Sequence, residues 1–235
     1  PSTLGRLEGV SYNDDLGFGT DARVDLRGFG GEAKQSLVLF DGLRAVEPFD
    51  NSVSWHLYPS EYLRQIDVYR GGGSTVYGEG ALSGVIAMQT KGPTKDFHLA
   101  AEESYGSFAS WKNFVEASGT VQDTGFYIGS RYFTTDGYRD NADHESTTAL
   151  FKLQRKLSEF IEAKNSFYHA YNKTGIPGPL TQSEVQRDRR QKDPDGLFGD
   201  GFDDTLDQNE LTLTYFAEPV NTEFSNMFGW RHREQ

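Results

Sequence analysis

The sequence predicts a small α+β domain followed by long antiparallel β-strands of the type that cross a membrane. Three observations support this fold class. Short and varied apolar segments fill the chain as far as Lys91, and seven alternating apolar and polar runs follow it without helical periodicity. Aromatic residues make up 14% of the 235 residues. No apolar run approaches the roughly 20 residues that a membrane helix requires, so any crossing would be made by strands.

The elements of the first part are predicted from local patterns. Alternation of apolar and polar residues between glycine-bearing turns predicts strands. A short helix is expected to begin at Ser60, because this residue can cap a helix after Pro59. Tyr62, Leu63 and Ile66 then have helical spacing. The expected strands are 23–30, 36–43, 66–70 and 84–91.

The segment 69–93 holds the densest run of glycine in the chain. A phosphate-binding P-loop needs Lys and then Ser or Thr after its last glycine, where Ala81 and Leu82 stand instead. A dinucleotide-binding turn needs a long helix after its glycines, but the segment from Gly84 reads as a strand. We therefore expect a compact turn in which glycines adopt positive φ or approach other backbone closely. Its glycines are Gly71, Gly78, Gly80 and Gly84.

The runs after Lys91 indicate strands because their side chains alternate with a period of two. In the first run, Phe97 and Leu99 lie on the side opposite to His98 and Glu102. A membrane barrel is favoured by strands of about 9–11 residues, aromatic residues near strand ends, and connections that alternate between short and long. A secreted β-rich domain for carbohydrate binding or adhesion is the alternative. The runs are 96–106, 110–121, 125–138, 147–157, 161–171, 209–220 and 222–230.

Composition and missing motifs exclude several classes of function. The net charge of −12 opposes binding to nucleic acid phosphates. The absence of cysteine removes disulfides and thiol catalysis. The five histidines are scattered, and His144 and Glu145 lack a second histidine at helical spacing. No Gly-x-Ser-x-Gly elbow occurs, so the chain is not expected to be an enzyme.

Five sequence motifs stand out along the chain: VDLRGFG at Val24, LVLFDGLRAVE at Leu37, YLRQIDVYRGGGSTVYGEGALSGVIAMQTK at Tyr62, TTDGYRDN at Thr134 and IPGPLT at Ile176. Together they resemble a TonB-dependent outer-membrane receptor. The resemblance covers most of the chain and implies a plug domain at 1–92, lacking its N-terminal part, and barrel strands and loops at 93–235. It also implies a barrel of the large, 22-stranded type, which seven strands cannot close, so the chain is expected to hold only part of a receptor.

The same resemblance implies energy-dependent uptake of a scarce nutrient, foremost a ferric siderophore, across the outer membrane of a Gram-negative bacterium. The implied partners are a TonB-type energy-transducing protein of the inner membrane, a small-molecule or metal-chelate ligand, and outer-membrane lipid and lipopolysaccharide. The plug apices are expected to contact the ligand, although polar loop residues are often only solvated. The candidate contacts are Glu32, Lys34, Phe49, Asp50, Asn51 and Trp55.

Two plug arginines, Arg27 and Arg70, are expected to latch the plug to the barrel wall. In the family that the chain resembles, arginines at matching positions meet glutamates of the barrel. Glu102, Glu103 and Glu116 are the candidates within this chain. A desolvated arginine–carboxylate pair is costly to break, yet the two groups can still be separated by force.

An acidic cluster lies in the long connection that follows Asn172. Calcium binds several carboxylate oxygens in such clusters, although the EF-hand spacing is absent and a solvated loop is the simpler explanation. No other cofactor is expected. The basic stretch that begins at Arg187 would partly neutralise the cluster or attract an anionic ligand. The candidate calcium ligands are Asp193, Asp195, Asp200, Asp203 and Asp204.

Overall fold

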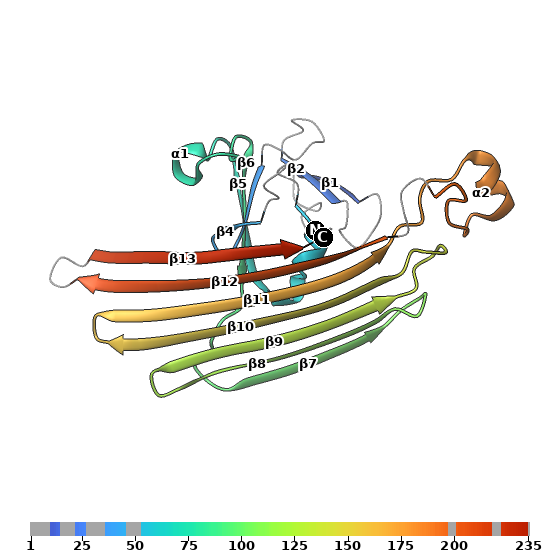
Figure 1. Ribbon diagram of the computed structural model, residues 1–235. Coiled ribbons are helices and arrows are strands. Elements are labelled where there is room, and N and C mark those ends of the chain that lie inside the picture. The colour runs from blue at the N-terminus through green and yellow to red at the C-terminus, as the bar shows by residue number, and fades with distance from the viewer. Residues whose placement is uncertain are drawn as a thin grey trace. The chain divides into compact units, whose positions relative to one another are not determined.

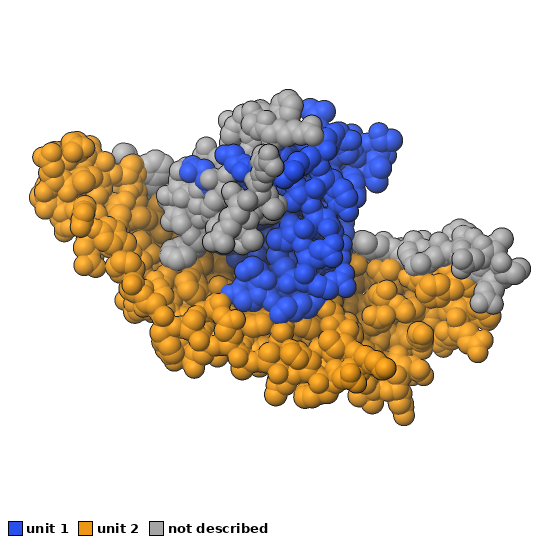
Figure 2. Space-filling model, turned by 180° about the vertical axis from the view of Figure 1, so that it is seen from behind, with its two compact units in different colours: residues 1–91 blue, residues 92–235 orange. Residues whose placement is uncertain are grey.

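The computed structural model describes residues 10–14, 22–26, 36–45, 53–196, 201–217 and 222–234. The chain divides into two compact units, shown in different colours in Figure 2. Unit 1 comprises Pro1–Lys91 and unit 2 comprises Gly92–Gln235. Each unit is described by itself.

Unit 1 contains two small β-sheets. In the first, β1 (Val10–Asp14) pairs antiparallel with β2 (Ala22–Leu26). The second has the strand order β4-β3-β6-β5, in which β3 and β6 are parallel and the other pairs are antiparallel. The two central strands are rich in apolar residues because they are largely buried. The bounds are β3 (Ser36–Phe40), β4 (Leu43–Arg44), β5 (Leu63–Arg70) and β6 (Gly84–Thr90).

The helix expected from Ser60 is wrong. Residues 60–62 form only one 3₁₀ turn, η3 (Ser60–Tyr62), and β5 begins directly after it at Leu63. Pairing of β5 with β6 supplies hydrogen bonds along the segment, and this long-range pairing overrides a short helical spacing. Another 3₁₀ turn, η2 (Trp55–Leu57), precedes it. A four-residue helix within the glycine-rich turn, α1 (Ser74–Tyr77), was not predicted.

Unit 2 is one antiparallel sheet in which the strands lie side by side in chain order, from β7 to β13 (Figure 1). This confirms the expectation of seven strands after Lys91. Several of them are longer than the strands of an ordinary globular protein. The bounds are β7 (His98–Tyr105), β8 (Trp111–Val121), β9 (Thr124–Thr135), β10 (His144–Ser158), β11 (Ile161–Gly175), β12 (Gly201–Ala217) and β13 (Thr222–Glu234).

The connections between these strands alternate in length. Two residues join β8 to β9 and β10 to β11, at 122–123 and 159–160. At the other end of the sheet the connections are longer, and they run over 106–110, 136–143 and 176–200. We call these three connections the first, second and third loops. The third loop carries a helix, α2 (Gln182–Asp188), which lies beyond the end of β11 (Figure 1).

The two faces of the sheet differ in chemistry. One face carries large apolar side chains opposite one another, since Ile128 is paired with Phe151 and Phe151 is paired with Phe167. These side chains are 52%, 39% and 37% exposed, which is unusual for the interior of a soluble sandwich. The same face carries Leu99, Val115, Leu153, Leu211 and Leu213. The opposite face carries charged and polar groups, among them Glu102, Lys112, Lys152, Gln154, Glu162 and Lys164.

Aromatic rings gather at the end of the sheet that bears the longer loops. Tyr105 and Trp111 stack with their ring centroids 6.5 Å apart, and Trp111 meets Tyr132 edge-on at 5.5 Å. Amphipathic rings at one end of an apolar face are typical of the interface between a bilayer and water. In the part of the chain that the structure describes, no helix combines the length and the hydropathy needed to cross a membrane.

Candidate functional site

The glycine-rich turn between β5 and β6 is held by backbone hydrogen bonds. The N–H groups of Gly71 and Gly73 donate to the carbonyl oxygens of Ser83 and Ala81, at 3.0 and 2.8 Å. These two donors are therefore already used and do not converge on an open anion site. Arg44 braces the same turn, because its Nη2 donates to the carbonyl oxygen of Glu79 at 2.7 Å.

The glycines of this turn have backbone conformations that other residues adopt only with strain. The φ angles are +115° at Gly71, +79° at Gly78, +86° at Gly80 and +157° at Gly84. At Gly84 space is also limiting, since a Cβ atom would lie 2.3 Å from the carbonyl oxygen of Tyr69. Positive φ and close backbone approach thus both occur in the turn.

Most of the expected ligand contacts lie outside the described residues. These are Glu32, Lys34, Phe49, Asp50 and Asn51, and Arg27 of the expected latch lies outside as well. Trp55 is described, and its side chain in η2 is only 4% exposed. Contact between Trp55 and a ligand therefore stays a prediction that requires its ring to become uncovered.

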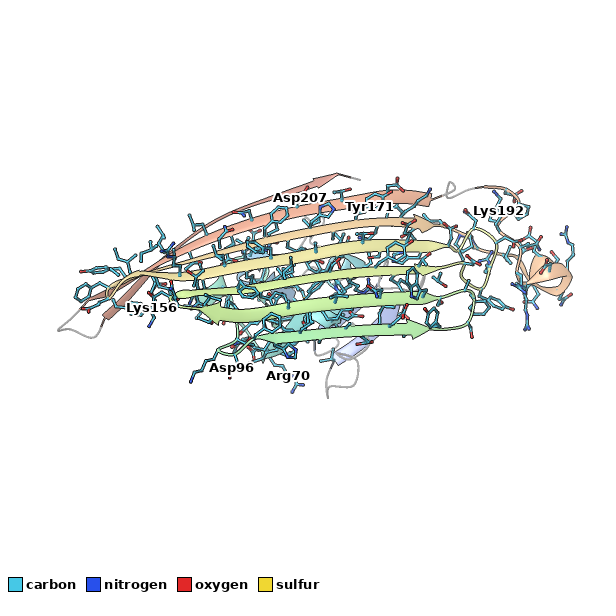
Figure 3. The ribbon with its side chains drawn as sticks, turned by 90° about the horizontal axis from the view of Figure 1, so that it is seen from below. Arg70, Asp96, Lys156, Tyr171, Lys192 and Asp207 are labelled. Atoms are coloured by element: carbon cyan, nitrogen blue, oxygen red, sulfur yellow. The ribbon has the colours of Figure 1, made fainter. Side chains whose placement is uncertain are left out.

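The second latch residue, Arg70, ends β5 with an exposed side chain, which Figure 3 labels. Its three candidate partners on the sheet already have other contacts. Glu102 pairs with Lys112 at 2.7 Å. Glu103 accepts hydrogen bonds from the Tyr105 hydroxyl and the Trp111 indole, at 2.7 and 3.0 Å, and Glu116 accepts one from the Tyr127 hydroxyl at 2.7 Å. The latch stays a prediction.

The acidic cluster is not arranged as the sequence suggested. Asp203 and Asp204 belong to β12 and not to the third loop, and neighbouring strand residues point to opposite faces. Asp193 is nearly buried, and its Oδ1 accepts a hydrogen bond from the backbone N–H of Asp195 at 2.9 Å. Within the described ranges, no group of three or more acidic or histidine side chains could hold a metal ion. Asp200 lies outside those ranges, so a calcium site with Asp193 and Asp195 stays a prediction.

The structure also joins two motifs that the sequence could not bring together. Arg139 of TTDGYRDN donates hydrogen bonds to the carbonyl oxygens of Pro177 and Gly178 in IPGPLT. The two motifs are separated by two long strands, β10 and β11. The only available signal was their density of glycine and proline, which indicates turns but not their partners.

The family is decided by the first part of the chain. Residues 2–85 match the model of the TonB-dependent Receptor Plug Domain. The chain belongs to the TonB-dependent receptors. The four glycines of the turn, from Gly71 to Gly84, all lie within the matched plug residues of this receptor chain. The relatives are transporters and receptors and not enzymes, as expected. The match to a plug domain favours a receptor over the alternative of a secreted carbohydrate-binding or adhesion domain.

The receptor chain also resembles curated proteins along its sequence. It is 32% identical over 191 residues to the vitamin B12 transporter BtuB of Vibrio cholerae, which covers 71% of this chain and 31% of the relative. It is 30% identical over 168 residues to BtuB of Vibrio vulnificus, which covers 66% and 27%. The chain therefore spans about a third of the length of the curated relatives that it matches.

Solved structures share the fold of the receptor chain. The ferric citrate transporter FecA in its unliganded form superimposes with a TM-score of 0.81 and 20% identity, covering 99% of this chain and 37% of FecA. The ferric yersiniabactin uptake receptor FyuA of Yersinia pestis gives 0.78 and 15%, covering 98% and 37%. At these identities the comparisons support a shared fold, but not a shared ligand.

Proposed function

We propose that the chain forms the plug and the first barrel strands of a receptor for energy-dependent uptake of a scarce metal chelate across the outer membrane of a Gram-negative bacterium. The observation that carries the proposal is the division of the seven-stranded sheet into an exposed apolar face and a polar face. In a membrane barrel, the apolar face contacts lipid and the polar face lines the lumen. A plug domain in the same chain then accounts for gated passage.

The two ligand classes draw support from different comparisons. The relatives at 30% and 32% identity are vitamin B12 transporters, which favours cobalamin. The ferric citrate and ferric yersiniabactin proteins are 20% and 15% identical, so they favour a ferric siderophore only through the shared fold. Both ligands are metal chelates that exceed the size of simple solutes. The proposal therefore includes a ferric siderophore and cobalamin as its two candidates.

The proposal gives specific contacts to residues of the plug and of the sheet. The apical residues contact the chelate, and Arg27 and Arg70 latch the plug until a TonB-type protein applies force. Outer-membrane lipid contacts the apolar face around Ile128, Phe151 and Phe167. Lipopolysaccharide contacts the basic residues near Arg187. The apical residues are Glu32, Lys34, Phe49, Asp50, Asn51 and Trp55.

Growth of a deletion strain tests the proposed uptake. We expect the strain to fail at limiting concentrations of either cyanocobalamin or one ferric siderophore, and the intact gene to restore growth. High concentrations of the same nutrient should restore growth without the gene, because slow entry through other routes then suffices. Normal growth on every limiting iron and cobalamin source would overturn the proposal.

A further inference from the structure

The second and third loops of unit 2 are connected by one arginine side chain. Arg139 donates from Nε and Nη2 to the carbonyl oxygen of Gln191, at 3.1 and 2.8 Å. Its Nη2 also donates to the carbonyl oxygen of Pro177 at 3.1 Å, and Nη1 donates to that of Gly178. We call this arrangement the Arg139 clasp. Four hydrogen bonds to three carbonyl oxygens use most of the donors that a guanidinium has.

The backbones of the two loops are joined on both sides of the clasp. The N–H of Asp140 donates to the carbonyl oxygen of Arg190 at 2.7 Å, and the N–H of Gly175, the last residue of β11, donates to the carbonyl oxygen of Asp143 at 2.9 Å. The side-chain amide of Asn141 donates to the carbonyl oxygen of Ile176 at 2.8 Å. Hydrogen bonds at so many points leave the two loops little freedom to move apart.

The third loop is also closed upon itself where the clasp binds it. The N–H of Asp193 donates to the carbonyl oxygen of Pro177 at 2.7 Å. Gly178 has φ of +65°, and a Cβ atom there would lie 2.5 Å from the Cβ of Asp193. The Gln191 side chain donates to the carbonyl oxygen of Glu184 in α2 at 2.9 Å. The position of α2 therefore depends on the segment that Arg139 holds.

The first loop joins the same body through the second. The N–H of Asp136 and the hydroxyl of Thr135 both donate to the carbonyl oxygen of Phe108, at 2.9 and 3.2 Å. The Phe108 ring meets the Tyr138 ring edge-on at 5.7 Å. Tyr138 in turn lies under the guanidinium groups of Arg189 and Arg190, at 6.0 and 5.8 Å. Three successive loops thus form one connected structure.

From these contacts we propose that Arg139 is a positioning residue, which fixes the three loops as one rigid wall of the ligand entrance before any ligand arrives. The proposal of a ligand entrance rests on the proposed function, whereas the rigidity does not. Long surface loops are usually mobile, and a ligand that orders them loses affinity to the entropy cost. A preformed wall avoids that cost. Closure over a ligand must then come from other parts of the receptor.

Lysine should not replace Arg139 in this role. Its single ammonium group cannot present a planar set of donors to three separate carbonyl oxygens. Arg139→Lys keeps the charge but loses the clasp, so it separates the geometry of the side chain from its charge. Arg187→Gln is the matched control, because it removes one positive charge from α2 and leaves the hydrogen bonds of the Arg139 clasp in place.

Distances between spin labels in the intact receptor test the rigidity directly. The chain has no cysteine, so none of its own residues competes with labels placed at Q186C in α2 and L153C in β10. We expect a narrow distance distribution, the same with and without cyanocobalamin or ferric citrate. Arg139→Gln and Arg139→Lys should both broaden it, and Arg187→Gln should not. A broad distribution in the unaltered receptor, a shift on adding either probe, or an unchanged distribution in Arg139→Gln would overturn the proposal.

Uptake of radiolabelled cyanocobalamin and ferric citrate tests the consequence for function. For the probe that is taken up, Arg139→Gln should raise the half-saturating concentration by about tenfold, since ordering the loops then opposes binding. The maximal rate should be retained, which a merely misfolded receptor would not do. An unchanged half-saturating concentration would overturn the role in binding. If neither probe is taken up, the proposed function fails for these ligands, while the label distances still decide the rigidity.

Discussion

Asp41 and Thr90 are 49 residues apart, yet both carboxylate oxygens of Asp41 accept hydrogen bonds from Thr90. The backbone N–H of Thr90 donates to Oδ1 at 2.9 Å, and its hydroxyl donates to Oδ2 at 2.6 Å. Asp41 itself has a positive φ of 49° and precedes Gly42, whose φ is 90°. Its N–H donates to the carbonyl oxygen of Met88 at 2.9 Å. The turn after β3 is therefore fixed to the end of β6.

Asp41→Ala should destabilise the plug by about 1–3 kcal/mol, because it leaves two partly buried donors of Thr90 without their acceptor. Urea denaturation of the intact receptor, followed by hydrogen exchange of the backbone amides of β3 and β6, measures the loss. The matched control is Glu79→Gln, since this carboxylate is exposed in the same unit. Equal stability of the two variants would contradict the importance of the Asp41 contact.

Gly84→Ala should cost about 3 kcal/mol or more, because the new Cβ would lie 2.3 Å from the carbonyl oxygen of Tyr69 at a strained φ. Gly78→Ala should cost less, about 1–2 kcal/mol, since its φ is positive but the nearest atom is 3.5 Å away. Gly72→Ala is the control, with its nearest atom 4.0 Å away. The melting temperature should therefore be lowest for Gly84→Ala, higher for Gly78→Ala and highest for Gly72→Ala. Any other order would contradict the described turn.

The backbone amides of helix α2 should lose protection against hydrogen exchange at acidic pH. The side chain and backbone N–H of Thr181 donate to Glu184 and hold the pKa of this carboxyl below its ordinary value of 4.5. A lowered pKa in the folded state means that the contribution is complete above 4.5 and is lost as the pH falls through the lowered value. Hydrogen-exchange rates of the backbone amides of residues 182–188, corrected for the pH dependence of the intrinsic exchange rate, measure this loss of protection.

Glu184→Gln separates the charge from the hydrogen bonds. Glutamine can complete the same capping box with Thr181, but it does not titrate. We expect its protection to remain constant over the pH range in which the unaltered helix loses protection. A parallel loss in both proteins would assign the effect to another titrating group.

Phe167→Lys and Ser166→Lys compare the two faces of β11 at adjacent positions. Phe167 lies on the apolar face, where a lysine near the middle of a bilayer costs about 2–4 kcal/mol. Ser166 lies on the polar face and should tolerate the charge better. The amount of folded receptor recovered in lipid vesicles measures the difference. Equal recovery of both variants would show that the apolar face does not contact lipid.

Much of the strand organisation could be predicted because apolar and polar residues alternate in the sequence with a period of two. Phe151 and Leu153 alternate with Lys152 and Gln154, and a buried or lipid-facing surface requires that alternation wherever the strands pair. The prediction was wrong at Ser60, where a few residues of helical spacing were outweighed by the pairing of β5 with β6. It was wrong at Asp203 and Asp204 because these two adjacent carboxylates interrupt the alternation between Phe202 and Leu206 at the start of β12.

The sequence by itself determined that seven strands follow Lys91 and that the turn at 71–84 needs glycine, since alternation and the lack of a Cβ atom are local properties. The bounds of β12 were not determined, because this strand begins at Gly201 and the predicted run begins at Asn209. Tertiary structure alone decided which distant groups meet. The contact of Asp41 with Thr90 and the binding of Arg139 to Pro177, Gly178 and Gln191 depend on strand register and loop path. The partners in such contacts cannot be predicted from the residue types, because every residue supplies a backbone carbonyl oxygen that a side chain can bind.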